Sequence, residues 1–256
     1  MSEIIDKIRH RLHVQNNSFQ CMVVGEPGSG KSYAALTMCK KIDPTFNADR
    51  IVFNAVDFMN LVQDDLPVGA AIMCDEAGMW FSSREWNSIG NRVISTVLET
   101  YRYKNLCVFW TFPVLRMTDI NLRDLAHSVM ETVQIDRDNQ KVICKFKRIK
   151  INPISGNRRE IFPKKTLPNG EKVKITRIHV SRPSPELEKA YEERKQEILG
   201  DNYDQLLVKI TDKDPETKQK QKPNCKCHKC GNVWFTTSKA SNPCCSRCQA
   251  RTTTRI

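Results

Sequence analysis

Glycine, lysine and serine residues recur at close spacing in residues 25–32, which read G-x-x-x-x-G-K-S. Glycine adopts backbone angles that side chains forbid, so successive amide N–H groups of such a loop can turn inward toward an anion. Lys31 would reach the β- and γ-phosphate oxygens of a nucleotide, and Ser32 would hold Mg²⁺. The predicted phosphate cradle comprises Gly25, Glu26, Pro27, Gly28, Ser29, Gly30, Lys31, Ser32 and Tyr33.

A second cluster, Asp75 and Glu76, directly follows an apolar run over residues 69–74. Apolar and polar residues do not alternate in this run, which favours a fully buried parallel strand. We expect this strand to lie beside the strand that precedes the loop. Asp75 would organise Mg²⁺, and Glu76 would polarise the attacking water as general base. Alternatively, the two acids only cap the next segment. Their position, beginning 44 residues after Lys31, favours nucleotide hydrolysis with ATP and Mg²⁺ as cofactors.

The elements that must position these residues alternate along the chain. The pattern predicts strands at 19–24, 51–54, 69–74, 106–110 and 129–135, and helices at 33–41, 56–62, 89–103 and 122–126. Such alternation indicates an α/β fold with a parallel sheet flanked by helices. An amphipathic helix over residues 1–15 would pack against this core or a neighbouring subunit. Thr111 could bind the attacking water or the γ-phosphate, or could only satisfy local backbone.

Five stretches in this order carry a resemblance to a known family: GEPGSGKS at 25–32, AAIMCDEAG at 70–78, TYRYKNL at 100–106, VFWTFP at 108–113 and DINLRDL at 119–125. Over residues 18–136 the chain resembles the P-loop ATPases of the FtsK/HerA group, especially their zonula occludens toxin-like branch. The resemblance implies an additional-strand ATPase with a catalytic glutamate that forms rings and moves DNA. Thr111 stands where the family often has glutamine.

The same resemblance implies that a neighbouring subunit supplies an arginine to each site, where it would neutralise charge developing on the γ-phosphate. The candidates are Arg84, Arg92, Arg102 and Arg123, of which Arg102 and Arg123 are preferred because they flank the fourth predicted strand. Each of them could instead be an ordinary solvated side chain. The loop itself offers no second cation, which is the reason for expecting one from elsewhere.

Charge is unevenly distributed along the 256 residues. The net charge of +12 separates into −3 for residues 1–140 and +15 for residues 141–256. Residues 141–182 alternate apolar and basic side chains, with turn signals at 152–156 and 169–170, which predicts basic β-hairpins. Phosphate backbone contact with DNA is the expected use, and a solubilising extension is the alternative. A charged helix would then follow from 184 to 199.

Six of the eleven cysteines crowd into residues 225–248. Two C-x-x-C pairs, Cys227 with Cys230 and Cys245 with Cys248, are separated by fourteen residues and predict a tetrahedral zinc site of the zinc-ribbon type. Cys225 and Cys244 could each replace a ligand. The ribbon could bind nucleic acid or a protein partner. The remaining cysteines suit buried thiols of a reduced compartment.

These features define four predicted parts: an ATPase core at 1–140, a basic β-hairpin extension and helix at 141–200, a linker at 201–224 and a zinc ribbon at 225–256. No apolar run reaches the roughly 20 residues that span a bilayer, so we expect a cytoplasmic protein without membrane insertion. The expected function is Mg²⁺-dependent ATP hydrolysis acting on DNA, in an oligomeric motor for translocation or packaging in a virus or mobile element. A helicase-loader or replication-initiation switch, and a nucleotide-gated DNA-binding protein with weak hydrolysis, remain alternatives.

Overall fold

The computed structural model describes residues 1–79, 101–117, 120–211, 225–234, 244–245, 247–251 and 253–255. The chain divides into two compact units, Met1–Ile198 and Leu199–Ile256. The predicted helix at 89–103 lies outside the described residues except at its end, where Tyr101–Lys104 forms the 3-10 helix η4. Arg84 and Arg92 also lie outside them. None of the helices that the structure describes is long and apolar enough to cross a membrane.

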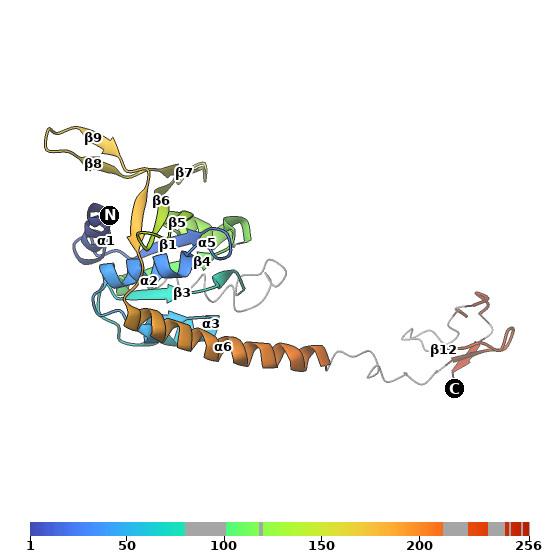
Figure 1. Ribbon diagram of the computed structural model, residues 1–256. Coiled ribbons are helices and arrows are strands. Elements are labelled where there is room, and N and C mark those ends of the chain that lie inside the picture. The colour runs from blue at the N-terminus through green and yellow to red at the C-terminus, as the bar shows by residue number, and fades with distance from the viewer. Residues whose placement is uncertain are drawn as a thin grey trace. The chain divides into compact units, whose positions relative to one another are not determined.

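Eight strands of the first unit form one mixed sheet (Figure 1). Its order is β10-β6-β5-β1-β4-β3-β2, and β7 also pairs with β6. Strands β1 to β5 run parallel to their neighbours in that group, whereas β6 is antiparallel to β5, β10 and β7. The strands are β1 Phe19–Val24, β2 Ile51–Val52, β3 Ala71–Cys74, β4 Cys107–Phe112, β5 Ser128–Asp136, β6 Lys141–Ile151, β7 Arg158–Ile161 and β10 Ile178–Ser181.

Helices cover both faces of this sheet because alternate strand residues point to opposite sides. Cys21 and Val23 of β1 belong to one apolar core, which α1, α2 and α6 cover, whereas Met22 belongs to a second core under α3 and α5. The sequence prediction of a flanked α/β sheet is therefore confirmed. The helices are α1 Ser2–His13, α2 Lys31–Ile42, α3 Ala55–Gln63, α5 Ile120–Leu125 and α6 Pro185–Thr211, with 3-10 turns at η1 Ala48–Arg50, η2 Ala77–Met79 and η5 Leu115–Met117.

One neighbour relation differs from the prediction. Strand β3, which precedes Asp75, does not lie beside β1, because β4 is inserted between them. Every residue of β4 is buried, including Phe109 and Trp110, so this strand suits a central place with both edges paired. The expectation of adjacency was wrong, whereas the additional strand that the family resemblance implied is present.

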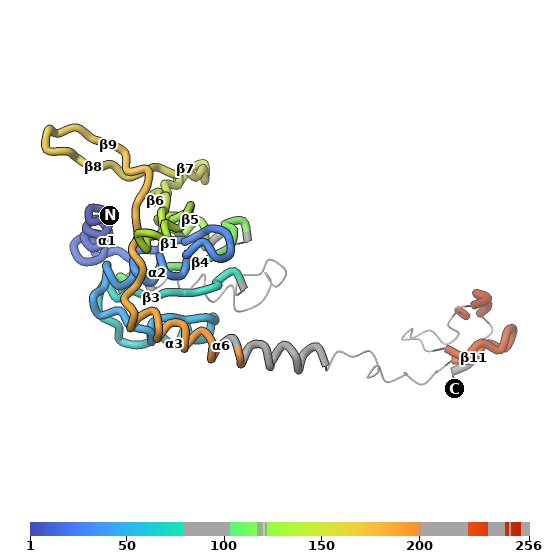
Figure 2. Tube along the Cα trace, viewed as in Figure 1, coloured from blue at the N-terminus to red at the C-terminus, as the bar shows by residue number. Residues whose placement is uncertain are grey.

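The basic extension is continuous with the main sheet. Val142, Cys144 and Phe146 of β6 are buried, as their alternation predicted, and β6 pairs with β5 across the boundary drawn at residue 140. Beyond β7, strands β8 Lys164–Thr166 and β9 Lys172–Lys174 form a separate hairpin whose residues are all exposed. The hairpin projects from the sheet (Figure 2), and Val173, one of its apolar residues, is exposed rather than packed in a core.

Helix α6 is longer than the sequence suggested. It was expected to close at Gly200, but it continues to Thr211. A helical glycine costs only about 1 kcal/mol relative to alanine, and Gly200 lacks the positive φ of a capping glycine. One glycine is therefore not enough to end the helix.

The second unit contains a small sheet of three strands in the order β12-β11-β13. Strand β11 Cys225–Cys227 is central and pairs antiparallel with β12 Val233–Trp234 and with β13 Thr253–Arg255. Cys225 is buried in this sheet. The short strands bring together segments that flank both C-x-x-C pairs.

Helix α1 gives a stability prediction. Leu12 is fully buried in the core under α1. Replacing it with alanine leaves a cavity, which the surrounding side chains fill only in part. We expect Leu12→Ala to lower the free energy of unfolding by about 2–5 kcal/mol in urea denaturation. Val14→Ala is the control: Val14 is 68% exposed, and its loss should change stability by at most about 0.5 kcal/mol. Equal effects would mean that α1 does not pack as described.

Candidate active site

The predicted phosphate cradle is a turn between β1 and α2. Gly28 and Gly30 have φ values of 75° and 84°, which only glycine adopts without strain, and Gly30 is the N-cap of α2. A Cβ atom at Gly25 would lie 2.0 Å from Thr132 Oγ1, so that position also requires glycine. The loop therefore directs backbone N–H groups and the positive end of a helix dipole at one place, which is an anion site.

Lys31 lies at the start of α2 with its side chain folded over the loop. Its Nζ donates to the carbonyl oxygen of Glu26 at 2.7 Å. Burial lowers the pKa of Lys31, although the nearby Asp75 and Glu76 charges oppose this shift. An ammonium that is partly desolvated and held by a single carbonyl within its own loop is well placed to bind phosphate oxygens instead.

Asp75 is fully buried directly beyond the end of β3. Its Oδ1 accepts hydrogen bonds from Ser32 Oγ at 2.9 Å and from Thr111 Oγ1 at 2.7 Å. The register explains the second contact, because Cys74 pairs with Trp110 and the next residues on both strands point to the same face. Ser32 and Asp75 thus form the hydroxyl and carboxylate pair that suits Mg²⁺.

Glu76 is held in an unusual backbone conformation. Its φ of 50° lies in the left-handed region, which costs a non-glycine residue about 1–3 kcal/mol. The Glu76 N–H donates to Thr111 Oγ1 at 2.8 Å, which helps to hold this conformation. The Thr111 hydroxyl group therefore donates to the Asp75 carboxylate and accepts from the Glu76 backbone, and its predicted contact with water or the γ-phosphate stays a prediction. Glu76 itself is partly exposed and lines the cavity in front of the loop.

Sequence reasoning missed two side chains of α6 that reach this site. Tyr191 OH donates to Asp75 Oδ2 at 2.7 Å, and Lys195 Nζ lies 2.8 Å from Glu76 Oε1 and 3.4 Å from Asp75 Oδ2. Burial opposes the charge on Lys195, but Asp75 and the hydrogen bond to Glu76 outweigh it and raise the Lys195 pKa. Their spacing of four residues places both on one helix face, which is the only sequence signal that they act together.

A cavity of about 630 Å³ opens in front of these groups. Residues of the loop, Asp75, Glu76, Thr111 and Lys195 line it, and its size is within the range of small-molecule sites. The donor set fits a nucleotide with Mg²⁺: amides and Lys31 for phosphates, and oxygen ligands for the ion. Bound there, the ion would neutralise charge on phosphate oxygens.

Of the four predicted arginines, the structure describes the side chain of Arg123 only, and that side chain does not line the cavity. Arg123 lies on α5, where its carbonyl oxygen accepts from Arg158, and it is not among the residues that line the cavity. Arg102 belongs to η4, and its side chain lies outside the described residues. Among described residues that line the cavity, the cations are Lys31 and Lys195. Lys195 of α6 is thus a second cation at the cavity, and its printed partners are Asp75 and Glu76, while an arginine from a neighbouring subunit stays a prediction.

In the second unit, the thiols of Cys227, Cys230, Cys245 and Cys248 all lie within 4.8 Å of one another. Two S–S distances are 3.7 Å, close to the edge of about 3.8 Å that four Zn–S bonds of 2.3 Å give in a tetrahedron. The Arg247 N–H points at Cys245 Sγ, 3.4 Å away, as expected of a metal-binding knuckle. Cys244 instead donates to the Gln249 carbonyl oxygen. This cluster could hold zinc.

Neither protein-family models nor curated protein sequences give a match to this chain. Among solved structures it is similar to the N-terminal domain of zonular occludens toxin from Neisseria meningitidis, with 19% identity and a TM-score of 0.39 over 56% of this chain and 93% of that one. The chain is also similar to the genome packaging NTPase B204 from Sulfolobus turreted icosahedral virus 2 in complex with ATP-gammaS. The identity is 12% and the TM-score 0.34, over 57% of this chain and 97% of that one. For a KaiC-like protein from Pyrococcus horikoshii OT3, the identity is 10% and the TM-score 0.33, over 62% of this chain and 90% of that one.

Identities and TM-scores this low carry no argument about activity, so the assignment depends on the chain's own residues. A glycine loop joins β1 to α2, the buried Asp75 is bonded to the loop serine, and Glu76 lies beside it at the cavity. This is the arrangement that a P-loop nucleotide hydrolase site requires.

The cysteine cluster gives a metal prediction. Purified protein should contain one zinc ion per chain, and Cys245→Ser should lose most of it, because three thiolates leave the tetrahedron open. Inductively coupled plasma mass spectrometry measures the ratio of zinc to protein. Cys244→Ser is the matched control, since Cys244 is the adjacent residue but lies outside the cluster. If Cys244→Ser lost zinc and Cys245→Ser kept it, the ligand set would be wrong.

Proposed function

We propose that this chain is an Mg²⁺-dependent ATP hydrolase that acts on DNA, as an oligomeric motor for DNA translocation or packaging in a virus or mobile element. The observation that carries the proposal is the carboxylate pair: Asp75 bonded to Ser32 of the loop, and Glu76 beside it at the cavity. In this arrangement Lys31 and the loop amides bind phosphates, while Glu76 orients and deprotonates the attacking water. Thr111 positions the Asp75 carboxylate and the Glu76 backbone through its hydrogen bonds.

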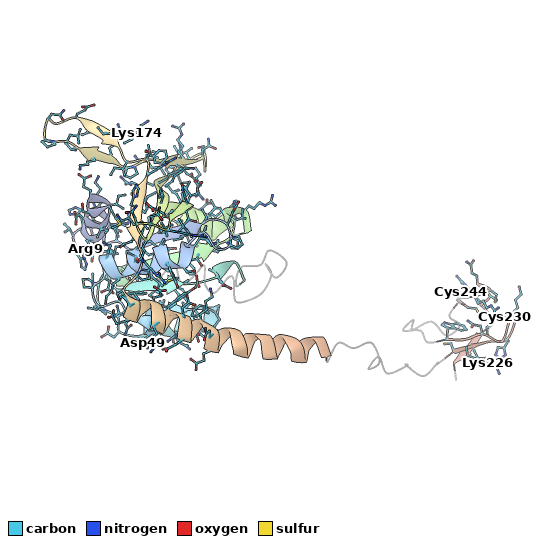
Figure 3. All side chains as sticks on the ribbon, in the orientation of Figure 1. Arg9, Asp49, Lys174, Lys226, Cys230 and Cys244 are labelled. Atoms are coloured by element: carbon cyan, nitrogen blue, oxygen red, sulfur yellow. The ribbon has the colours of Figure 1, made fainter. Side chains whose placement is uncertain are left out.

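A basic groove in the first unit supports DNA as the partner. Its volume is about 420 Å³, and of the described residues that line it none is acidic. Five cations from α1, β6, β8 and β9 line this groove. The β8–β9 hairpin can be found in Figure 3 by its labelled residue Lys174. Closely spaced ammonium and guanidinium groups without acidic partners suit the regularly spaced phosphates of a nucleic acid. The groove cations are Lys7, Arg148, Lys150, Lys164 and Lys172.

The oligomeric part of the proposal depends on charge at the γ-phosphate. No arginine is present among the described residues that line the cavity, and motor ATPases stabilise their transition state with such a side chain. Arg102 or Arg123 of a neighbouring subunit would fill this role in a ring. The ribbon of the second unit would then guide DNA or hold a protein partner.

The catalytic assignment predicts a separation of binding from turnover. Glu76→Gln should reduce ATP hydrolysis by about 100-fold or more, within the range that general bases contribute, and should retain Mg²⁺-ATP binding. Lys31→Ala should lose both, because it removes the cation of the cradle. Phosphate release measures the rate of hydrolysis, and equilibrium binding of a fluorescent ATP analogue measures the affinity for nucleotide.

If Glu76→Gln hydrolysed ATP at the original rate, the general-base role would be wrong. DNA-stimulated hydrolysis supports a motor, whereas turnover that is indifferent to DNA supports the switch or the weakly hydrolysing binding protein. Mixing Arg102→Ala with Lys31→Ala subunits tests the trans arginine, since activity returns only where complementary subunits meet.

The groove predicts salt-dependent DNA binding. Replacing Lys164 and Lys172 together with alanine should weaken binding by about 10-fold or more, and should reduce the slope of log affinity against log salt by about 2, since each lost phosphate contact contributes about 0.9. Fluorescence anisotropy at several salt concentrations measures both. The charge-matched control, Lys41→Ala with Lys189→Ala, removes exposed lysines outside the groove. An equal loss in the control would argue against a defined groove site.

A further inference from the structure

Helix α6 is bound to the hydrolysis site by one of its faces. Tyr191 is 2% exposed, stacks on Phe53 with ring centroids 6.3 Å apart, and donates to Asp75. One turn further along, Lys195 meets Glu76. Since Tyr191 is held in the core, the position of Lys195 is fixed by packing, and its pairing with Glu76 is a built feature of the fold.

Further contacts bind the beginning of α6 to the loop helix α2. Tyr33 follows Ser32 directly, and its hydroxyl group lies 3.0 Å from Glu188 Oε1 and 2.9 Å from Glu192 Oε1. Arg182 pairs with Glu188 and lies over the Tyr33 ring. The residues of α6 at 188, 191, 192 and 195 therefore form one face against the nucleotide site, as the helical spacing allows.

The Lys195 contacts engage the two carboxylates that hydrolysis requires. Its ammonium lies 2.8 Å from Glu76 Oε1, the group proposed to take a proton from water, and 3.4 Å from Asp75 Oδ2. This pair occupies a lone-pair site of Oε1 and holds the Glu76 side chain in one orientation, so the carboxylate turns freely toward water only when the pair opens. A divalent ion held by Ser32 and Asp75 would also face this like charge at short range, where repulsion is strong.

We propose that Lys195 is a positioning residue that restrains Glu76, so that α6 lowers hydrolysis until the Lys195–Glu76 pair opens. Binding of Mg²⁺-nucleotide and formation of the pair then compete. This inference rests on the proposed function, because it regulates the same site. It also differs from a catalytic role, in which Lys195 would contact the γ-phosphate and its loss would reduce turnover.

The test replaces Lys195 with methionine, which keeps the length of the side chain and removes its charge. Lys195→Met should raise the rate of ATP hydrolysis about 3- to 10-fold and tighten binding of Mg²⁺ with a fluorescent, non-hydrolysable ATP analogue by a similar factor. Lys195→Arg should stay close to the original protein because it keeps the charge. Lys189→Met is the control on the same helix, since Lys189 is exposed and does not line the nucleotide cavity.

A double replacement separates restraint from a general change in the helix. In a Glu76→Gln background, Lys195→Met should tighten analogue binding less than it does alone, because the pair with Glu76 is already lost and only the contact of Lys195 with Asp75 remains to be removed. A fall in hydrolysis or in affinity after Lys195→Met would overturn the inference, as would unchanged values of both. If Lys195→Met does not fold, Lys195→Gln takes its place in every comparison.

Failure of the inference and of the proposed function give different results. Tighter analogue binding without any hydrolysis in either protein would leave the restraint intact and contradict the hydrolase. Hydrolysis that depends on Glu76 but falls after Lys195→Met would leave the hydrolase intact and contradict the restraint.

Discussion

The carboxylate of Asp75 is the group on which the first unit depends. It is fully buried, and four side chains contact it: Ser32 and Thr111 at one oxygen, Tyr191 and Lys195 at the other. A buried charge without partners costs several kcal/mol, so the loop, β4 and α6 must all be in place around it. The same carboxylate that suits Mg²⁺ therefore also joins three elements that are far apart in the sequence.

This arrangement links structure to control of the reaction. Thr111 holds Asp75 and the Glu76 backbone, and Lys195 holds the Glu76 side chain, so the strained glutamate is fixed from both ends. The contacts around Asp75 are therefore formed before nucleotide arrives, and the Lys195–Glu76 pair is the one that the nucleotide would have to open. The basic groove lies on other elements of the same unit, on α1, β6, β8 and β9.

Much of this site was predictable because the relevant signals are local. The loop residues, Asp75 with Glu76 and the paired cysteines follow fixed spacings that reflect one turn, one strand end and one metal geometry. The place of β4 between β1 and β3 was not predictable from apolar runs, which show burial but not neighbours. Tyr191 and Lys195 were missed because docking of α6 depends on packing 116 and 120 residues away from Asp75, and no local pattern records it.

The central claim is that Asp75 couples Mg²⁺ to nucleotide binding, and a titration of a fluorescent ATP analogue with and without Mg²⁺ tests it most directly. The original protein should bind the analogue at least about 10-fold more tightly with the ion, a coupling of about 1.4 kcal/mol. Asp75→Asn, which keeps the shape of the side chain but removes its charge and one of its two accepting oxygens, should bind equally with or without Mg²⁺. An undiminished effect of Mg²⁺ in Asp75→Asn would contradict the account.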